Sequence, residues 1–259
     1  MIDRIVPATT DADRAEVAAL LGLEDAWPVV AEPFLQWVIE DRFAGARPRL
    51  ELGGAEFVSD VAPYERMKLR MLNGTHSMMA YLGYLGGHEF IAEVIAAPEF
   101  RRLVANAFAE EIAPTLGMPK AQTDAYAAKL LERYSNTALR HRTYQIAMDG
   151  SQKLPQRLLG TIADRIAAGA PFERLALGVA AWMIYARGVD EKGQPIAVQD
   201  PLQAEFAKVD PADVVGGFLA LERIFPRELA QNATFRAAVE RQYSLLREVG
   251  AAEAVRRVG

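Results

Sequence analysis

Residues 63–87 read PYERMKLRMLNGTHSMMAYLGYLGG. Pro63 is suited to the first turn of a helix, because its φ angle is fixed near the helical value. The pair Gly86-Gly87 supplies the free backbone on which helices commonly end. Apolar side chains cover much of the surface between these limits, and they are Met67, Met71, Leu72, Met78 and Met79. The stretch therefore predicts one long, largely buried helix.

Four polar residues of this helix fall on one side of it. Each residue turns the helix by about 100°, so the angle around the helix axis relative to Lys68 is about 60° for Glu65 and about 80° for His76. Asn73 lies at about 140°, so all four residues fit within an arc of about 140°. Such an arc has two interpretations. It is either a solvated helix face or a set of side chains arranged around one substrate.

The second interpretation has specific chemistry. Oxidation of a secondary alcohol requires a base for the hydroxyl proton, and lysine serves where burial or positive neighbours favour its neutral amine. An amide such as Asn73 can donate a hydrogen bond to the developing alkoxide. His76 can hold a second substrate oxygen. Glu65 is suited to relaying the proton to solvent.

Helical signals continue on both sides of this segment. An N-cap at Thr10-Asp11 and a stop at Gly22 bound a first helix. Residues 27–60 mix aromatic and β-branched residues with Pro and Gly, which predicts two or three short strands. The polar segment 188–201 is expected to be a loop, and the apolar run 175–186 a buried core helix. Further helices are expected at 89–96, 98–112, 123–135, 137–147, 155–168, 172–187, 211–223 and 233–248.

Composition limits the functional classes. The chain has 259 residues, 51% of them hydrophobic, and a net charge of −5, which argues against a general nucleic-acid-binding protein. No cysteine is present, so thiolate catalysis and disulfides are excluded. Three scattered histidines make a poor metal site, and no metal is expected. No signal peptide or membrane-spanning run is visible, which predicts a soluble, cytoplasmic protein.

A dinucleotide-binding motif is missing from the sequence. No G-x-G-x-x-G motif follows a predicted strand and opens a helix. The cluster of Gly83, Gly86 and Gly87 lies at the end of a helix, where it cannot offer free amides to a pyrophosphate. We therefore expect the isolated chain not to bind a dinucleotide in the usual way.

The long helix resembles a segment of the long-chain mannitol dehydrogenase and fructuronate (mannonate) reductase family. The likeness lies in PYERMKLRMLNGTHSMMAYLG, MIDRIVPATTD near the start and QIAMDGSQKLPQR at 145–157. AEPFLQWVIEDRF at 31–43 and GVDEKGQPIAVQDP at 188–201 are also similar to that family. Its central motif is Lys68-x4-Asn73-x2-His76, which is far more specific than a lone spacing.

The resemblance implies a fold and a set of roles. It implies a mainly α-helical catalytic domain over residues 1–259, like the C-terminal domain of 6-phosphogluconate dehydrogenase, with its β portion near 27–60 and the Rossmann domain absent. Lys68 would be the general base, Asn73 half of an oxyanion clamp and His76 a substrate ligand. Glu65 would gate the proton path. Asp3 and Lys153 would bind substrate.

The resemblance also bears on cofactor and substrate. The complete enzyme would use NAD or NADP, bound mainly by an N-terminal Rossmann domain or a complementing chain, and no metal. Arg142, Lys153 and Arg157 are candidates for a cationic wall that binds a sugar-acid carboxylate. Mannitol enzymes of the family tend to carry an arginine where this chain has Gln145. Mannonate/fructuronate is therefore favoured over mannitol/fructose.

Several alternatives stay open. Lys153 could instead point to water beside an ordinary helix start, and His141 and His88 are interpreted as incidental surface or turn residues. The chain could be the catalytic half of a longer dehydrogenase, inactive by itself. It could also be a non-catalytic sugar-binding or assembly module that complements a separate nucleotide-binding chain.

Overall fold

The predicted long helix is present in the computed structural model, which describes residues 1–259. It runs without a break through α2 (Ala62–Met67), η2 (Lys68–Gly74) and α3 (Thr75–Leu85). Pro63 lies in its first turn and Gly86 follows its last residue, as expected. Almost every residue of α3 is buried. The segment is therefore the structural axis on which the candidate polar residues are placed.

The middle of this helix is not the regular α-helix that the sequence predicts. Segment η2 is π-helical, with hydrogen bonds from residue i to i+5. Side chains stabilise its displaced carbonyl groups: the Thr75 hydroxyl donates to Met71 O at 2.6 Å, and the Tyr134 hydroxyl donates to Leu72 O at 2.9 Å. Because residues five apart align in a π-turn, Lys68 and Asn73 share a face more closely than the α-helical arc suggests.

The hydrophobic core is organised around α10 (Glu173–Ala186). Every residue from Leu175 to Ala186 is buried, so the apolar run is a core helix, as predicted. It packs against α3 on one side and against α14 (Ala233–Val258) on another. No helix of the chain is both long and apolar enough to cross a bilayer.

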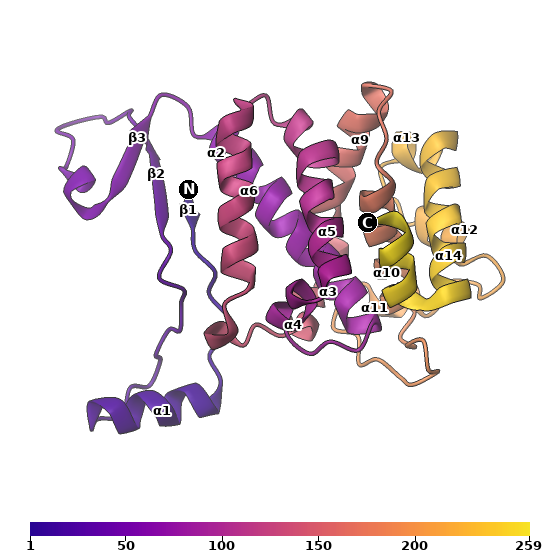
Figure 1. Cartoon of the computed structure of the whole chain (residues 1–259), viewed down its shortest axis with the longest axis horizontal. Coiled ribbons are helices and arrows are strands. Elements are labelled where there is room, and N and C mark those ends of the chain that lie inside the picture. Colours follow the sequence, from indigo (N-terminus) through magenta and orange to yellow (C-terminus); the bar gives the residue numbers. More distant parts are fainter.

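Shorter helices complete the helical body (Figure 1). Those before α10 are α4 (Ile91–Ala96), α5 (Pro98–Asn106), η3 (Ala107–Ile112), η4 (Ala113–Thr115), α6 (Lys120–Tyr134), η5 (Thr137–Leu139), α7 (Thr143–Ala147), α8 (Gly150–Leu154), η6 (Pro155–Leu159) and α9 (Gly160–Ala167). Those after it are α11 (Gln203–Phe206), α12 (Val214–Leu219) and α13 (Arg227–Ala230).

Most predicted helices are present, but their boundaries differ where the backbone turns. The expected helix 137–147 is divided, because Arg140 adopts a left-handed conformation with φ 43°. The helix expected from 155 starts earlier, at Gly150. The last helix continues to Val258 with a kink at Gly250, whose φ is 78°. The loop 188–201 contains no helix or strand, as predicted.

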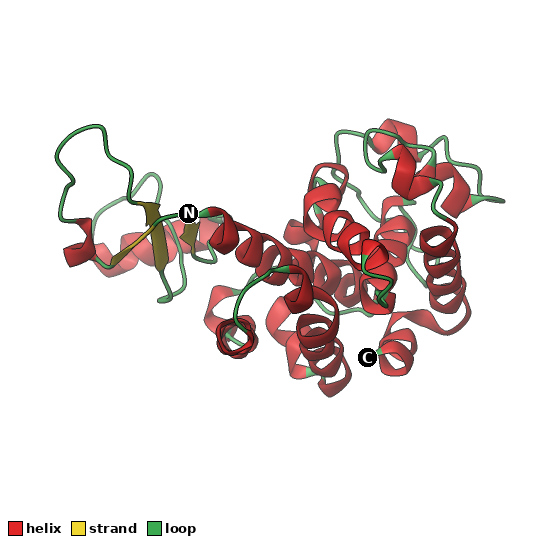
Figure 2. Cartoon of the chain, turned by 90° about the horizontal axis from the view of Figure 1, so that it is seen from above, coloured by secondary structure: helices red, strands yellow, loops and turns green.

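The first 58 residues project from the helical body (Figures 1 and 2). They contain α1 (Asp11–Leu21), η1 (Leu50–Gly53) and the three strands β1 (Ile2–Asp3), β2 (Gln36–Glu40) and β3 (Ala55–Val58). Strand β2 pairs antiparallel with β1 and parallel with β3. The short strands expected at 27–60 are therefore confirmed, and a third strand pairs with them from the start of the chain.

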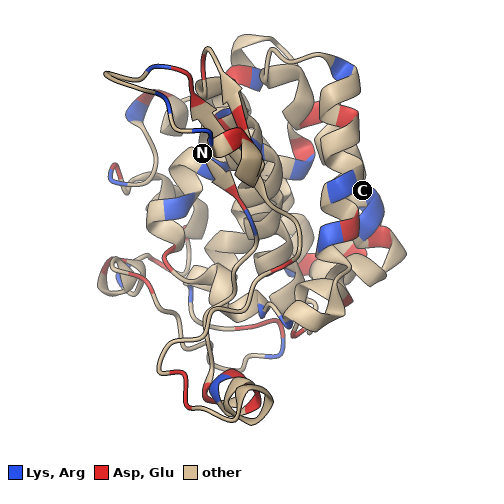
Figure 3. Ribbon diagram, turned by 90° about the vertical axis from the view of Figure 1, so that its left-hand side faces the viewer, with Lys and Arg blue, Asp and Glu red and all other residues tan.

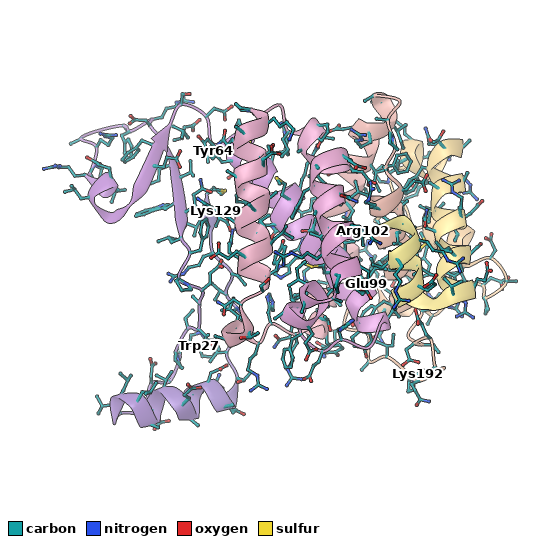
Figure 4. All side chains as sticks on the ribbon, in the orientation of Figure 1. Trp27, Tyr64, Glu99, Arg102, Lys129 and Lys192 are labelled. Atoms are coloured by element: carbon teal, nitrogen blue, oxygen red, sulfur yellow. The ribbon has the colours of Figure 1, made fainter.

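This projecting segment carries nearly all of the exposed large apolar side chains. No residue of α1 is buried. Trp27, on the segment after α1, is 72% exposed (Figure 4). The other exposed apolar residues of this region are Ile2, Val6, Leu20, Leu21, Leu23, Val29, Leu35, Phe43 and Leu52, and outside it only Val189 is comparable. Apolar surface so concentrated is typical of a face that packs against a partner.

Charges of both signs are interspersed along the chain (Figure 3). Several of these charges form ion pairs between residues three or four positions apart on the same helix, such as Lys120 with Asp124 at 2.6 Å.

Candidate active site

A cavity of about 210 Å³ lies where the long helix meets the first residues of the chain and the start of α8. Its volume is below the roughly 300–1,000 Å³ of drug-sized pockets, so it suits a small metabolite. The lining residues are mostly polar, and they are Arg4, Ile5, Val6, Lys68, Leu72, Asn73, His76, His141, Gln145, Ile146, Lys153 and Arg157. Five of the seven residues predicted for the site are among them.

Lys68, Asn73 and His76 all line this cavity from one helix. The Lys68 ammonium donates a hydrogen bond to Ile2 O at 2.5 Å, which ties the helix to strand β1. The π-turn aligns Asn73 with Lys68, and His76 follows in the first turn of α3. Three of the four residues of the arc therefore line one cavity, and Glu65 is the exception.

His76 is held by aromatic neighbours. Its imidazole is 6% exposed, with the Tyr134 ring at 5.0 Å and the His141 ring at 4.9 Å between centroids. Burial lowers the pKa of His76 well below 6.5, and positive charge at His141 and Arg157 would lower it further. The ring is therefore neutral near pH 7, and it can both donate and accept a hydrogen bond.

The cavity also has a cationic side. Lys153 is half-buried, and its ammonium donates to Met148 O at 2.5 Å and Ile146 O at 3.2 Å. Burial, followed by the charge of Arg157, lowers the pKa of Lys153. Arg157 donates to Ser77 Oγ at 2.9 Å. Both lysine and arginine can pair with a carboxylate, and the water-facing alternative for Lys153 does not hold.

Asp200 fixes the start of the helix that carries Lys153. Its carboxylate accepts from Ser151 N at 2.8 Å, Ser151 Oγ at 2.6 Å and Leu202 N at 2.9 Å. Asp149 just before this helix has a left-handed backbone, with φ 54°. The loop 188–201 therefore helps to orient the DGSQK segment toward the cavity.

Two π-helical segments meet beside the cavity. Segment η6 begins at Pro155, which has no N–H for the α-helical ladder. It packs on η2, and a Cβ placed on Gly74 would lie only 2.7 Å from Arg157 O. Only glycine at position 74 allows the two backbones to approach so closely.

Asp3 and Glu65 are not brought to the cavity. Asp3 is 0% exposed, and its carboxylate accepts from Arg133 at 2.7 and 3.0 Å and from Tyr126 at 2.6 Å. Asp3 therefore lies beneath the cavity lining in this structure, and its contact with substrate stays a prediction. Glu65 is exposed and lies one turn before Lys68, outside the lining residues.

Two further expectations need correction. Arg142 does not join the cationic wall, because it is about half exposed and pairs with Glu89 at 2.6 Å. Arg4 lines the cavity in its place. His141 is not an incidental surface residue, since it packs on His76 and lines the cavity. Its position depends on the left-handed turn at Arg140, for which the helical pattern of 137–147 gave no signal.

The residues of this chain do not fit the pyrophosphate of a dinucleotide. The connections that lead from a strand into the α-helices α1 and α2, residues 4–10 and 59–61, contain no glycine. The start of α1 is closed by a capping box between Thr10 and Asp13, with acidic residues in its first turn that would repel phosphate. No group of three potential metal-ligating side chains comes together either.

Comparison with known proteins identifies the family. Residues 60–247 match the model of the mannitol dehydrogenase C-terminal domain. The chain belongs to the mannitol dehydrogenase family. Residues 1–52 match the model of the family's Rossmann domain, so that domain is partly represented and not wholly absent. The projecting segment is thus the part of the chain that resembles the Rossmann domain.

Relatives and solved structures agree with this assignment. The chain is 52% identical to D-mannonate oxidoreductase of Escherichia coli K12, over 98% of this chain and 54% of the relative. It is 41% identical to mannitol 2-dehydrogenase of Phaeosphaeria nodorum, over 97% and 45%. A ternary complex of Pseudomonas fluorescens mannitol 2-dehydrogenase with NAD and D-mannitol superposes with TM-score 0.91 at 38% identity, covering 100% of this chain and 53% of that one. The chain spans about half the length of these relatives.

Proposed function

We propose that this chain supplies the substrate-binding and proton-transferring half of an NAD- or NADP-dependent dehydrogenase. The reaction interconverts a polyol or sugar acid and its ketose. The observation that supports it most is that Lys68, Asn73 and His76 line one cavity from a single helix. Membership of the mannitol dehydrogenase family supports the same chemistry.

Each of these three side chains has a distinct role in the proposal. The Lys68 amine removes the proton from the reacting hydroxyl group. The Asn73 carboxamide donates a hydrogen bond to the oxygen as negative charge develops on it, and a second amide from the remainder of the Rossmann domain completes the clamp. The neutral His76 imidazole holds a neighbouring substrate oxygen. Glu65, exposed one turn before Lys68, passes the proton on to solvent.

The cationic side of the cavity favours a sugar acid. Lys153 and Arg157 both line the cavity, and no carboxylate of the protein pairs with either. A substrate carboxylate would satisfy these charges through charge-assisted hydrogen bonds. We therefore favour mannonate/fructuronate over mannitol/fructose. The 52% identity to a D-mannonate oxidoreductase supports the same preference.

The proposal assigns the dinucleotide to a partner domain, in the same polypeptide or on a complementing chain. The exposed apolar residues of 1–52 offer this domain a surface. Hydride transfer requires the nicotinamide that this domain would hold. We therefore expect the 259-residue chain alone to show no NAD(P)H-dependent turnover of mannitol, fructose or fructuronate.

A reconstituted enzyme tests the proposal. The chain is joined to the N-terminal dinucleotide-binding domain of the E. coli D-mannonate oxidoreductase, and mannonate, altronate, mannitol and arabinitol are assayed with NAD and with NADP. Turnover of mannonate that exceeds turnover of mannitol supports the proposal. If every substrate is inert in a folded reconstituted protein, the chain is instead a non-catalytic sugar-binding or assembly module.

A further inference from the structure

His141 is a polar side chain at the cavity whose presence the proposed roles leave unexplained. Its ring stands edge-on to His76, at an interplanar angle of 89°. Its Nδ1 atom is buried and has no hydrogen-bond partner. Buried polar atoms without a partner cost stability, so such an atom beside a binding cavity calls for an explanation.

The backbone around His141 is built to aim this ring inward. Arg140 has the left-handed φ of 43°, which is uncommon for a residue other than glycine. His141 O accepts a hydrogen bond from Ile91 N at 3.0 Å, and Arg142 bridges to Phe90. These two contacts fix the backbone directly after the strained residue Arg140, and strain that the surrounding structure maintains is typical of functional sites.

Only one space beside the ring can hold a substrate. His76 and His141 border the cavity of about 210 Å³ and a second space of about 10 Å³ on their other side. The second space has room for about one water molecule. A sugar or sugar acid that reaches these rings must therefore occupy the larger cavity, with Lys68 and Asn73.

The chemistry of the ring indicates what it binds. Burial, followed by the charge of Lys153, lowers the pKa of His141 to about 4, so the imidazole is neutral near pH 7. A neutral imidazole has one N–H and one acceptor nitrogen, which suits a hydroxyl group that also donates and accepts. Lys153 and Arg157 are better suited to a carboxylate. The centroids of the His76 and His141 rings are 4.9 Å apart. The two imidazoles can therefore hold two hydroxyl groups of one sugar molecule.

We propose that His141 is a further substrate-binding residue, which hydrogen-bonds a substrate hydroxyl group next to the one held by His76. It thereby selects polyhydroxylated substrates over deoxy analogues. This inference rests on the proposed function, because it concerns the same cavity. It assigns recognition of the sugar chain to the imidazole pair and recognition of charge to the two cations.

The first experiment observes binding without turnover. The chain has three histidines, and His88 packs on Phe100 away from the cavity, so it is an internal control. The imidazole NMR signals of the 259-residue chain are followed while D-mannonate is added. We expect the signals of His76 and His141 to shift together while that of His88 stays in place. A shift of His76 without His141 would overturn the inference but leave the proposed function standing, whereas no binding at all would overturn both.

The second experiment uses two variants of His141 in the reconstituted enzyme. His141→Leu keeps the size of the side chain and removes its hydrogen bond, and we expect KM for mannonate to rise about tenfold with kcat within about threefold. His141→Gln restores an amide near the position of the imidazole nitrogen, so KM should return to within about threefold of wild type. An equal KM in all three proteins would overturn the inference.

Deoxy analogues then separate contact from structure. For the mannonate analogue without the hydroxyl group that His141 binds, the wild-type enzyme should already show the raised KM, and His141→Leu should add nothing. For the other monodeoxy analogues, His141→Leu should still raise KM about tenfold. If His141→Leu raises KM equally for every analogue, its effect is structural and the inference fails.

Discussion

Asp3 and Arg133 form a bidentate, fully buried salt bridge across 130 residues of sequence, with oxygen–nitrogen distances of 2.7 and 3.0 Å. Glu32 contacts the same guanidinium group at 2.7 Å, and the Phe34 ring lies 4.0 Å below it. Three residues of the projecting segment thus converge on one arginine of α6. This contact fixes the strand whose Ile2 carbonyl accepts from Lys68.

Removal of Arg133 should destabilise the chain strongly. Arg133→Leu leaves two buried carboxylates without a counter-charge, and we expect a loss of about 3–5 kcal/mol in the free energy of unfolding. Urea unfolding measures it. Arg236→Ala is the matched control, because Arg236 pairs with Glu240 on an exposed helix face and should change stability by less than about 0.5 kcal/mol. Equal effects of the two substitutions would contradict the structural role of Arg133.

Stability should also fall as the pH is lowered from 7 to 5. The pKa of His141 is about 4 in the folded chain and 6.5 in the unfolded chain, so the unfolded chain binds more protons between these values. His141 alone should therefore contribute a loss of about 2 kcal/mol between pH 7 and pH 5. The measurement is urea unfolding across this range. The His141→Leu variant should show a shallower pH dependence, and an unchanged slope would show that the ring is not buried in its neutral form.

Contact between the two π-helical segments should tolerate no side chain at position 74. Gly74→Ala places a methyl group against Arg157 O, and we expect a loss of about 1–3 kcal/mol together with weaker substrate binding. A methyl group on Gly45 would have no neighbour within 4 Å, so Gly45→Ala is the control and should be neutral. Thermal unfolding of both variants measures the loss. A Gly74→Ala protein as stable as wild type would refute the close contact between position 74 and the Arg157 backbone.

Asp200 is expected to act on binding through Lys153. Asp200→Ala removes the cap of α8, so the helix start should loosen, with a stability loss of about 1 kcal/mol and a KM for mannonate raised more than kcat is lowered. The Asp210 carboxylate also accepts a hydrogen bond from a nearby backbone N–H, that of Ala212, but on an exposed segment. Asp210→Ala is therefore the control and should leave KM unchanged. A fall in kcat alone would assign Asp200 a different role.

Much of the fold could be predicted because local signals were strong. Pro63 and Gly86 bound the long helix, and the apolar run 175–186 identified the core helix. Lys68, Asn73 and His76 were found because helical periodicity and a family motif both pointed to them. The resemblance also led to Lys153, and the need of a sugar acid for a cationic partner led to Arg157; both line the same cavity.

Other features depend on contacts that no local pattern reports. The π-turn at 68–74 needs the Tyr134 hydroxyl from a distant helix and close packing on η6. The buried position of Asp3 depends on Arg133 in α6, a partner 130 residues away that the family motif does not indicate. His141 turns inward because of one left-handed residue, Arg140, which an α-helical pattern cannot predict.

The role of Lys68 as general base is the central claim, and turnover of Lys68→Ala in the reconstituted enzyme tests it most directly. We expect kcat at neutral pH to fall by about 10²- to 10⁴-fold, and added primary amines to restore part of it. Lys192→Ala is the control and should retain full activity, because Lys192 is exposed (Figure 4) and does not line the cavity. A Lys68→Ala enzyme with an unchanged rate would contradict the account.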